Sequence, residues 1–343
     1  MIDSFWKGKN IFITGINGFI GSNLAKLLIS CGANVFGLVR NPDNRTLLYY
    51  EKIDKKIILI NGDLCDKELI SRIISEEQID TVFHLAAQVE VGVGIENPYL
   101  TFETNVRGTY TVLEAIRAYP KNIKSVVVAS SDKAYGSYDK SMMPYKEDYP
   151  LIPKYPYDTS KACADLIAKS YANDIYNLPI VVTRFSNIFG PGQLNFSAII
   201  PDGIRSALGI SSFIPRGDGS AIRDFIYVED VCDLYLKIAR KIAESKNNNF
   251  HGEVFNAGTN SPISMKEVIS KIFISLGNNK DLDKILKLME GKVTQGEIDT
   301  QYMDYDKVNK HFDWSPNHDF DSGLEKTIKW FQDYLAILKN KGS

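Results

Sequence analysis

The sequence predicts an α/β protein with a Rossmann-type doubly wound parallel sheet and a smaller C-terminal α/β domain. The first observation is that short apolar runs alternate with amphipathic segments of helical length in the first half of the chain, as parallel strands and crossover helices do. The second is a glycine-rich turn directly after the first apolar run. The third is a change of pattern after Gly190-Pro191-Gly192, beyond which the elements are shorter.

Six short apolar runs are expected to be buried parallel strands. They are Asn10–Thr14, Asn34–Val39, Lys56–Asn61, Thr81–Leu85, Ser125–Ser130 and Pro179–Phe185. The segments of helical length between them are Phe19–Ser30, Lys67–Glu76, Pro98–Tyr119 and Tyr157–Tyr176. Such sheets bind ligands at the carboxyl ends of their strands, so the residues after each strand are the candidates for chemistry.

The second half of the chain predicts a second domain. We place the first domain at residues 1–186 and the second at 187–343, with 224–260 returning to the first. Asp224–Asp230 and Glu253–Ala257 are the expected returning strands. The amphipathic segments Met265–Leu276 and Asp321–Leu338 are expected to cover the second domain.

Composition narrows the classes of function. Forty basic and 42 acidic residues leave a net charge of -2, which gives no electrostatic case for nucleic acid or an anionic membrane. No apolar run reaches transmembrane length, and the start of the chain lacks the apolar core of a signal peptide. Four widely spaced cysteines predict reduced thiols in a cytoplasmic protein. The four histidines show no metal-ligand spacing, so no metal site is predicted, and His84 is expected to be structural.

The run Thr14-Gly15-Ile16-Asn17-Gly18-Phe19-Ile20-Gly21 follows a strand and opens a helix. Glycines there permit a tight turn and close backbone approach to a pyrophosphate, which the helix N-terminus then attracts. In this context the turn predicts a dinucleotide site. Its candidate residues are Gly15, Asn17, Gly18, Phe19, Ile20 and Gly21.

The sequence does not distinguish NAD from NADP as the cofactor. An acidic residue after the second strand would favour NAD, but Arg40 stands there with Arg45 nearby, and arginine can pair with a 2′-phosphate. Arg40 could equally stack on adenine or face solvent. Asp63, beside Leu64 after the third strand, is either an adenine contact or a turn aspartate. Leu85-Ala86-Ala87 supplies small residues where the backbone must approach a cofactor.

Tyr157 and Lys161 are four residues apart on a predicted helix, so they share one face. For tyrosine to act as a base near neutral pH, its pKa of about 10 must fall by about three units. The Lys161 ammonium and a positively charged nicotinamide can together stabilise the phenolate. Ser131, at the end of a strand, can hold a substrate hydroxyl. This trio predicts proton and hydride transfer.

Asp132 and Lys133 follow Ser131 directly. A weak ion pair in a surface turn is one interpretation. The other is catalytic, because a carboxylic acid can protonate a leaving hydroxyl, and an amine can take a proton or stabilise an enolate. Lysine is a poor base at its ordinary pKa of about 10.4, so this role requires a lowered pKa at Lys133.

These residues together resemble the extended short-chain dehydrogenase/reductase family, which comprises sugar-nucleotide epimerases and dehydratases. The other markers are His84-Leu85-Ala86-Ala87, Thr104-Asn105-Val106-x-Gly108-Thr109 and Arg223-Asp224-Phe225-Ile226-Tyr227-Val228-x-Asp230. The resemblance implies an N-terminal domain for NAD(P), with Asn105 among its contacts, and a C-terminal domain for a nucleotide sugar. It also implies a homodimer formed through helices of the first domain.

Within that family, the Asp132-Lys133 pair looks like that of CDP-glucose 4,6-dehydratases, as do the opening Phe5-Trp6-x-Gly8-Lys9 and Ala86-Ala87-Gln88. Arg40 is unusual for that group, and the run from Arg184 to Gly192 looks more like the general epimerase pattern. The resemblance implies oxidation at C4, elimination of water across C5–C6 and return of the hydride to C6. Alternatives are a nucleotide-sugar C4 epimerase, a dehydratase that also inverts C5, and a non-catalytic NADP-sensing regulator.

The resemblance also implies where the nucleotide sugar binds. Arg223 and Asn187 match residues of the family that contact phosphate, whereas turn and ion-pair roles are their structural alternatives. Arg216 is a second candidate cation, and Asn195 with Phe196 could contact the base. Glu297 could face the substrate. The substrate-binding candidates are therefore Gln88, Asn187, Asn195, Phe196, Arg216 and Arg223.

Overall fold

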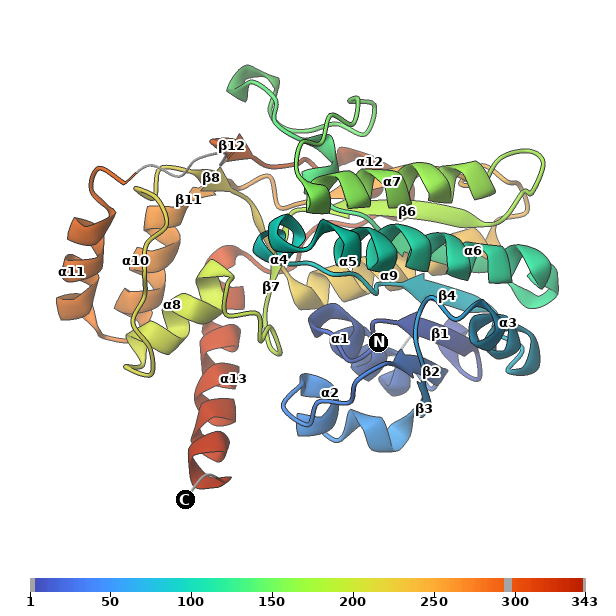
Figure 1. Cartoon of the computed structure of the whole chain (residues 1–343), viewed down its shortest axis with the longest axis horizontal. Helices are drawn as coiled ribbons and strands as arrows, with labels where there is room; N and C mark the ends of the chain where they lie inside the picture. The colour runs from blue at the N-terminus through green and yellow to red at the C-terminus, as the bar shows by residue number, and fades with distance from the viewer. Residues whose placement is uncertain (1–3, 293–297, 342–343) are drawn as a thin grey trace.

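The computed structural model describes residues 4–292 and 298–341, and its centre is a seven-stranded parallel sheet (Figure 1). The strands lie in the order β10-β6-β5-β4-β1-β2-β3. Their bounds are β1 Asn10–Thr14, β2 Asn34–Val39, β3 Ile58–Asn61, β4 Thr81–His84, β5 Ser125–Ala129, β6 Ile180–Phe185 and β10 Val254–Ala257. The order reverses between β1 and β4, which confirms the doubly wound fold and places the ligand crevice at their carboxyl ends.

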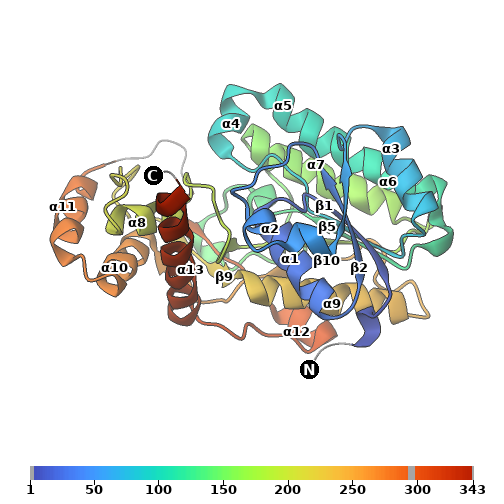
Figure 2. The same cartoon turned by 90° about the horizontal axis from the view of Figure 1, so that it is seen from below.

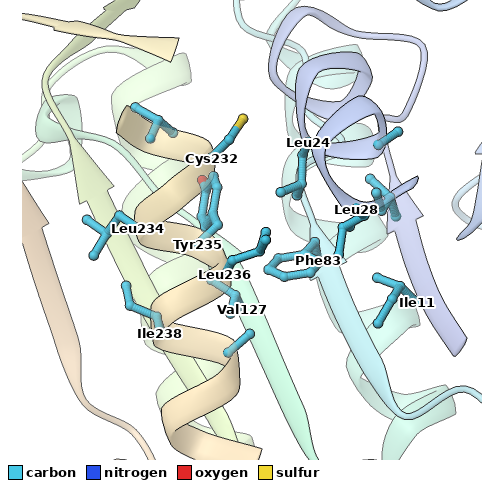
Figure 3. Packing of buried hydrophobic residues seen from close by; sticks show 14 of the residues in the cluster. Ile11, Leu24, Leu28, Phe83, Val127, Cys232, Leu234, Tyr235, Leu236 and Ile238 are labelled. Carbon is cyan, nitrogen blue, oxygen red and sulfur yellow. The ribbon is translucent and has the colours of Figure 1, made fainter. Parts of the chain in front are cut away.

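Helices cover both faces of this sheet, and its strands are largely buried except for the edge strand β3. The burial expected for Lys56–Asn61 is wrong, because Ile58 on β3 is 51% exposed. The helices are α1 (Phe19–Ser30) and α9 (Val228–Glu244) on one face, and α3 (Lys67–Glu76), α6 (Gly108–Ala118) and α7 (Pro156–Tyr171) on the other. Ile11 and Ile13 join the first core, while Phe12 between them joins the second, as strand periodicity requires. Figure 3 shows Leu24 of α1 and Tyr235 of α9 directed toward Phe83 of β4.

A second group of elements lies beside the sheet, where α8, α10, α11 and α13 gather (Figure 2). The strands are β7 Asn187–Phe189 with β9 Phe225–Tyr227, and β11 Ile263–Ser264, β8 Ile222–Arg223 and β12 Thr300–Gln301 in a three-stranded sheet. The helices are α8 Ile199–Ala207, α10 Met265–Ser275, α11 Asn279–Met289 and α13 Phe320–Lys341. A separate apolar core joins them. The domain boundary at residues 186/187 stays a prediction.

The remaining elements are short. The helices are α2 Leu47–Tyr50, α4 Val91–Glu96, α5 Pro98–Phe102 and α12 Asp306–Phe312. The 3-10 turns are η1 Ser4–Trp6, η2 Ile53–Lys56, η4 Pro120–Asn122, η5 Asp132–Tyr135 and η6 Lys140–Met142, and η3 Glu103–Arg107 is a π-helical turn. No helix in the described parts of the chain is both long enough and apolar enough to cross a membrane.

The prediction of a returning strand at Asp224–Asp230 is wrong. Only β9 is extended there, and it pairs with β7 rather than with the main sheet. The chain turns into α9 at Val228, because Glu229 and Asp230 suit the first turn of a helix and apolar residues then follow at helical spacing. The strand expected at Glu253–Ala257 is present as β10 and joins the main sheet beside β6.

Several other expected elements have different bounds, most by one to three residues, and the largest differences are these. The strand expected from Lys56 begins at Ile58, because the preceding residues form η2. The helix expected to reach Tyr176 ends at Tyr171. The segment Pro98–Tyr119 is not one regular helix, because η3 interrupts it between α5 and α6. Such π turns are frequent at functional sites, and this one carries Asn105.

Candidate active site

Glycines in the turn between β1 and α1 allow close packing of the backbone around it. Gly15 has a φ of +71°, and a Cβ there would lie 2.8 Å from the backbone of the loop after β4. A Cβ at Gly21 would overlap the carbonyl oxygen of Gly15. Gly18 provides no side-chain cap for α1, so the first helical amides, those of Phe19 and Ile20, can be donated to a ligand. These features fit the pyrophosphate of a dinucleotide.

A hydrogen-bonded chain holds the loop Leu85-Ala86-Ala87 against this turn. Oγ1 of Thr14 accepts hydrogen bonds from the backbone amides of Leu85 and Ala86 at 3.1 and 3.2 Å, and lies 2.8 Å from Nδ1 of His84. Nε2 of His84 lies 2.9 Å from Oγ1 of Thr109. Burial lowers the pKa of His84 to about 3, so the ring is neutral and structural.

Asn105 ties three segments together below the cofactor crevice. Its Oδ1 accepts from the backbone amide of Gln88 at 2.7 Å. Its Nδ2 donates to the Gln88 carbonyl at 2.9 Å and to Oγ of Ser160 at 2.8 Å. The buried amide therefore fixes the loop after β4 relative to α7, the helix that carries Tyr157. These contacts are structural, and a role of Asn105 toward the cofactor stays a prediction.

Arg40 and Asp63, from the ends of β2 and β3, meet at the carboxyl edge of the sheet. Their closest nitrogen and oxygen are 3.7 Å apart, and both side chains are about half exposed. Asp63 also accepts from the amide of Cys65 at 2.8 Å, which is the turn role. Leu64 is buried beside Gly108, where a Cβ would overlap it. The carboxylate of Asp63 thus partly offsets the charge of Arg40, and roles of both residues toward a cofactor stay predictions.

The loop after β2 is fixed by side chains from the glycine turn. Oδ1 of Asn17 accepts a short hydrogen bond from Thr46, and its Nδ2 donates to the carbonyl of Asn41 at 3.3 Å. The Arg45 guanidinium is paired with the carboxylate of Asp43 at 2.9 Å. Arg45 therefore pairs within its own loop. Arg40 is the arginine that lies nearer the end of β2.

Ser131, Tyr157 and Lys161 meet where β5 ends beside α7. Ser131 is the N-cap of η5, and Tyr157 and Lys161 lie one helical turn apart. Burial raises the pKa of Tyr157, whereas a hydrogen bond with Ser131 lowers it. Lys161 donates to the carbonyl of Ala129 at 2.6 Å, and burial lowers its pKa to about 8. The protein alone therefore leaves the phenol protonated, and further positive charge is needed to make it a base.

Asp132 and Lys133 are not an exposed surface pair. Asp132 is 3% exposed, and its Oδ1 accepts from the Ser131 hydroxyl at 3.0 Å. Its Oδ2 is buried without a hydrogen-bond partner among the described residues. Burial raises the pKa of Asp132, although the charges of Lys133 and Arg223 oppose this. The side chain is thus suited to carry a proton.

Two residues of this cluster escaped the sequence reasoning. Asp158 follows Tyr157, and burial raises its pKa to about 6 against the attraction of Lys133. Gln301 lies on β12 and is fully buried, and its Oε1 accepts from the Lys133 ammonium at 2.5 Å. The sequence does contain a signal for Asp158, because this carboxyl directly follows the candidate catalytic Tyr157. No sequence signal points to Gln301, because β12 is only two residues long.

Arg223 lies close to the same cluster. It pairs in register with Gln301 across β8 and β12, and its charge acts on the carboxyl of Asp132. The carboxylate of Asp224 accepts from the backbone amide of Thr259 at 2.7 Å and from its hydroxyl. Arg223 therefore belongs to the second group of elements, and its charge reaches the catalytic candidates on the main sheet.

A cavity of about 350 Å³ opens beside β8 and β12. Arg216 and Asp202 line it, together with Phe213, Met265 and Lys292. Ala221 and Asp299, which directly precede β8 and β12, also line it, and Arg223 and Gln301 come two residues further along the chain. With a rise of about 3.3 Å per residue, these strands bridge the cavity and the catalytic cluster over about 7 Å.

Four substrate candidates are engaged in local contacts, and two of them lie near the main sheet. Gln88 donates to the carbonyl of Glu90 and accepts from Thr101, at 2.9 and 3.0 Å. Nδ2 of Asn187 donates to the carbonyl of Asp224 at 3.2 Å. These contacts are structural, and roles of Gln88 and Asn187 toward a substrate stay predictions.

The other two, Asn195 and Phe196, lie outside the lining of the 350 Å³ cavity. Oδ1 of Asn195 accepts from the amide and hydroxyl of Ser197 at 2.9 and 2.6 Å, which is a turn role. The Phe196 ring stacks under the guanidinium of Arg205 at 4.1 Å. Roles of both residues toward a base stay predictions, and Glu297 lies outside the described residues.

Comparison with known proteins places the chain in a family. The family model described as GDP-mannose 4,6 dehydratase matches residues 12–327. A trifunctional UDP-glucose 4,6-dehydratase/UDP-4-keto-6-deoxy-D-glucose 3,5-epimerase/UDP-4-keto-L-rhamnose-reductase of Arabidopsis thaliana is 28% identical over 346 residues, which cover 96% of this chain and 48% of that protein. The chain thus spans about half the length of this curated relative.

Solved structures match over nearly the whole chain. The dTDP-glucose 4,6-dehydratase of Bacillus anthracis in complex with NAD is 31% identical, with a TM-score of 0.81 over 95% of this chain and 97% of that one. The UDP-glucose 4-epimerase of Thermotoga maritima with UDP-glucose is 27% identical, with a TM-score of 0.79 over 95% and 99%. The predicted family and fold are therefore confirmed. The chain belongs to the family described as GDP-mannose 4,6 dehydratase, which lies among the extended short-chain dehydrogenases/reductases.

Proposed function

We propose that this protein is a nucleotide-sugar 4,6-dehydratase, which converts a nucleoside-diphosphate hexose into its 4-keto-6-deoxy form. The observation that carries the proposal is the buried Asp132 with Lys133 beside Ser131. An epimerase needs only the hydroxyl, the phenol and the cofactor. A buried acid and an amine at the same strand end add what an elimination of water requires.

Oxidation at C4 is the first step. Tyr157 takes the proton of the C4 hydroxyl, and Ser131 donates a hydrogen bond to that oxygen. Lys161 stabilises the phenolate through its charge. When bound, the nicotinamide supplies the hydride acceptor and the positive charge that the phenol lacks in the protein alone.

Elimination follows at C5 and C6. The new C4 ketone acidifies the C5 proton, and Lys133 removes that proton or stabilises the enolate. Asp132, whose pKa is raised by burial, protonates the C6 hydroxyl, which leaves as water. The hydride then returns to C6. Atoms balance, because the sugar loses one water and the cofactor ends as it began.

The residues of the glycine turn fit a dinucleotide, and we propose NAD. The pairing of Asp63 with Arg40 supports this, because it offsets the charge that a 2′-phosphate would need. The NAD in the Bacillus anthracis structure supports it further. Mass spectrometry of the nucleotide released from the purified protein distinguishes NAD from NADP. Release of NADP would contradict this choice.

We propose that the 350 Å³ cavity holds a cytosine base. The carboxylate of Asp202 lies on its wall, and the charges of Arg205 and Arg216 act on it. A carboxylate accepts a hydrogen bond from the exocyclic N4 amine of cytosine, whereas uracil and thymine present an acceptor oxygen at that position. Arg216 can donate to the remaining acceptors of the cytosine edge. Arg223 then lies between the base and the sugar, where the pyrophosphate needs a cation.

We also propose a homodimer, in the cytoplasm, formed through α4 to α7. These helices lie together on one side of the molecule (Figure 1) and expose large apolar side chains. They are Ile95, Tyr99, Phe102, Tyr110 and Leu166. A second copy of the chain is the partner that such a face on a helical layer suits. The four free cysteines support a reducing compartment.

A C4 epimerase is the second candidate, favoured by the likeness to the Thermotoga maritima enzyme. Incubation with the CDP, dTDP, GDP and UDP derivatives of glucose separates the two. A dehydratase yields a product lighter by one water, with a carbonyl detectable by mass spectrometry after hydrazone formation. An epimerase yields an isomer of unchanged mass, and that result would contradict the proposed function.

A further inference from the structure

Gln301 stands apart from the other buried side chains of the site. It is fully buried on β12, and its two amide atoms have different environments. Oε1 accepts a hydrogen bond from the Lys133 ammonium at 2.5 Å. Nε2 is buried without a hydrogen-bond partner among the described residues. Leaving a buried amide donor unpaired costs free energy, so an acceptor for Nε2 is expected when the site is filled.

The orientation of this amide follows from chemistry. A lysine ammonium has three donors and no acceptor, so the oxygen of Gln301 must face Lys133. The NH₂ group is then turned away from Lys133, but it stays within a few ångströms of the ammonium because both amide atoms are bonded to the same carbon. A sugar held at Lys133 for removal of its C5 proton would bring hydroxyl oxygens, which are acceptors, to this NH₂ group.

We propose that Gln301 is a positioning residue, which orients Lys133 toward C5 and donates from Nε2 to a hydroxyl of the hexose. The inference rests on the proposed dehydratase function. A carboxamide suits this task because it directs the amine without adding negative charge. A carboxylate there would stabilise the ammonium and so weaken Lys133 as a base.

The groups that surround Lys133 already include charges of both signs. Asp132 precedes it, Asp158 attracts it from α7, and Arg223 lies on the strand paired with β12. The phenols near these charges are Tyr145 and Tyr157. Two carboxyls already lie nearby, and a third at position 301 would favour the protonated form of Lys133 still further. The neutral amide of Gln301 does not have this effect.

The test compares Gln301→Glu and Gln301→Met with the exposed-surface control Gln332→Glu. For Gln301→Glu we expect the acidic limb of the kcat profile to move up by about 1–3 pH units, with activity recovered at high pH. For Gln301→Met we expect kcat to fall about 10–100-fold and incorporation of solvent deuterium at C5 to fall with it, because the base is misplaced. Affinity for the nucleoside diphosphate, measured by calorimetry with CDP, should stay within about twofold, because the base and pyrophosphate contacts are intact.

The outcomes of this experiment distinguish a failure of the proposed function from a failure of this inference. If the wild type releases no water from any nucleotide sugar, the proposed function fails. If the wild type does, but both Gln301 variants keep its kcat and pH profile, this inference fails. An equal fall in kcat for both variants with no change in pH profile would make Gln301 merely structural and would also overturn the inference. If Gln301→Met does not fold, the near-isosteric Gln301→Glu tests the inference by itself, through the pH dependence of its kcat.

Discussion

The hydroxyl of Ser131 donates a hydrogen bond to Oδ1 of Asp132 over 3.0 Å, and Oδ2 of Asp132 is buried without a partner among the described residues. This contact joins the residue expected to hold the C4 oxygen to the residue expected to protonate the C6 hydroxyl. In the proposed mechanism, two steps at different carbons of the sugar are thereby coupled through adjacent residues at one strand end. Substitutions in the pair can separate the steps.

Asp132→Asn should stop the loss of water and spare oxidation at C4. The amide cannot supply the proton, so we expect kcat for the dehydrated product to fall about 10²–10⁴-fold. Oxidation is followed by the absorbance of reduced cofactor in a single turnover. Asp283→Asn, on the exposed face of α11, is the matched control. Full dehydratase activity in Asp132→Asn would exclude the acid role.

Lys133→Met should abolish the loss of water by blocking removal of the C5 proton. Some C4 oxidation remains, but the C5 proton is retained, so solvent deuterium does not enter C5. The measurement is the deuterium content of the sugar after incubation in D₂O. Lys140→Met, in the exposed turn η6, serves as control. Unchanged yield of the 4-keto-6-deoxy sugar would disprove the role of Lys133.

Gly15→Ala tests the dinucleotide cradle. Its Cβ would lie 2.8 Å from the backbone after β4, so we expect the purified protein to lose its bound nucleotide and its activity. Gly209→Ala is a closely matched control, because Gly209 has the same φ of +71° with nothing within 4 Å of a Cβ. The control carries only the backbone strain, about 1 kcal/mol. Equal nucleotide content in both variants would argue against the cradle.

Stability should fall in mild acid through His84. Its pKa is about 3 in the folded protein, against an ordinary value of 6.5 in the unfolded chain, so protons bind the unfolded chain first as pH falls. The contribution is therefore present above pH 6.5 and is lost progressively between 6.5 and 3. From pH 7 to pH 5 the loss is about 2 kcal/mol. Urea unfolding at the two pH values measures it, and His84→Asn should show a smaller dependence. An equal dependence in the variant would contradict the assignment.

Asp202→Asn tests the choice of base. The amide can donate where the carboxylate only accepts, so we expect kcat/KM for CDP-glucose to fall about 10-fold and the preference over UDP-glucose to narrow. The measurement is the ratio of kcat/KM for the two substrates. An unchanged ratio would remove Asp202 from base recognition. A wild-type preference for GDP-glucose would point to a purine in the cavity instead.

The sequence predicted most of the sheet and the core of the site, because both depend on local patterns. Buried runs of β-branched residues mark parallel strands, and Tyr157 with Lys161 needs only one helical turn. Asp224–Asp230 was misjudged, because its few apolar residues suit a strand and a helix start equally. Gln301 was missed, because its contact with Lys133 spans 168 positions in sequence.

The most direct test of the central claim uses CDP-glucose that carries deuterium at C4. If the chain oxidises C4, eliminates water and returns the hydride, the product is a 4-keto-6-deoxy sugar with that deuterium on C6. Mass spectrometry of the product locates the label. An isomer of unchanged mass with the deuterium still on C4 would contradict the account and identify an epimerase.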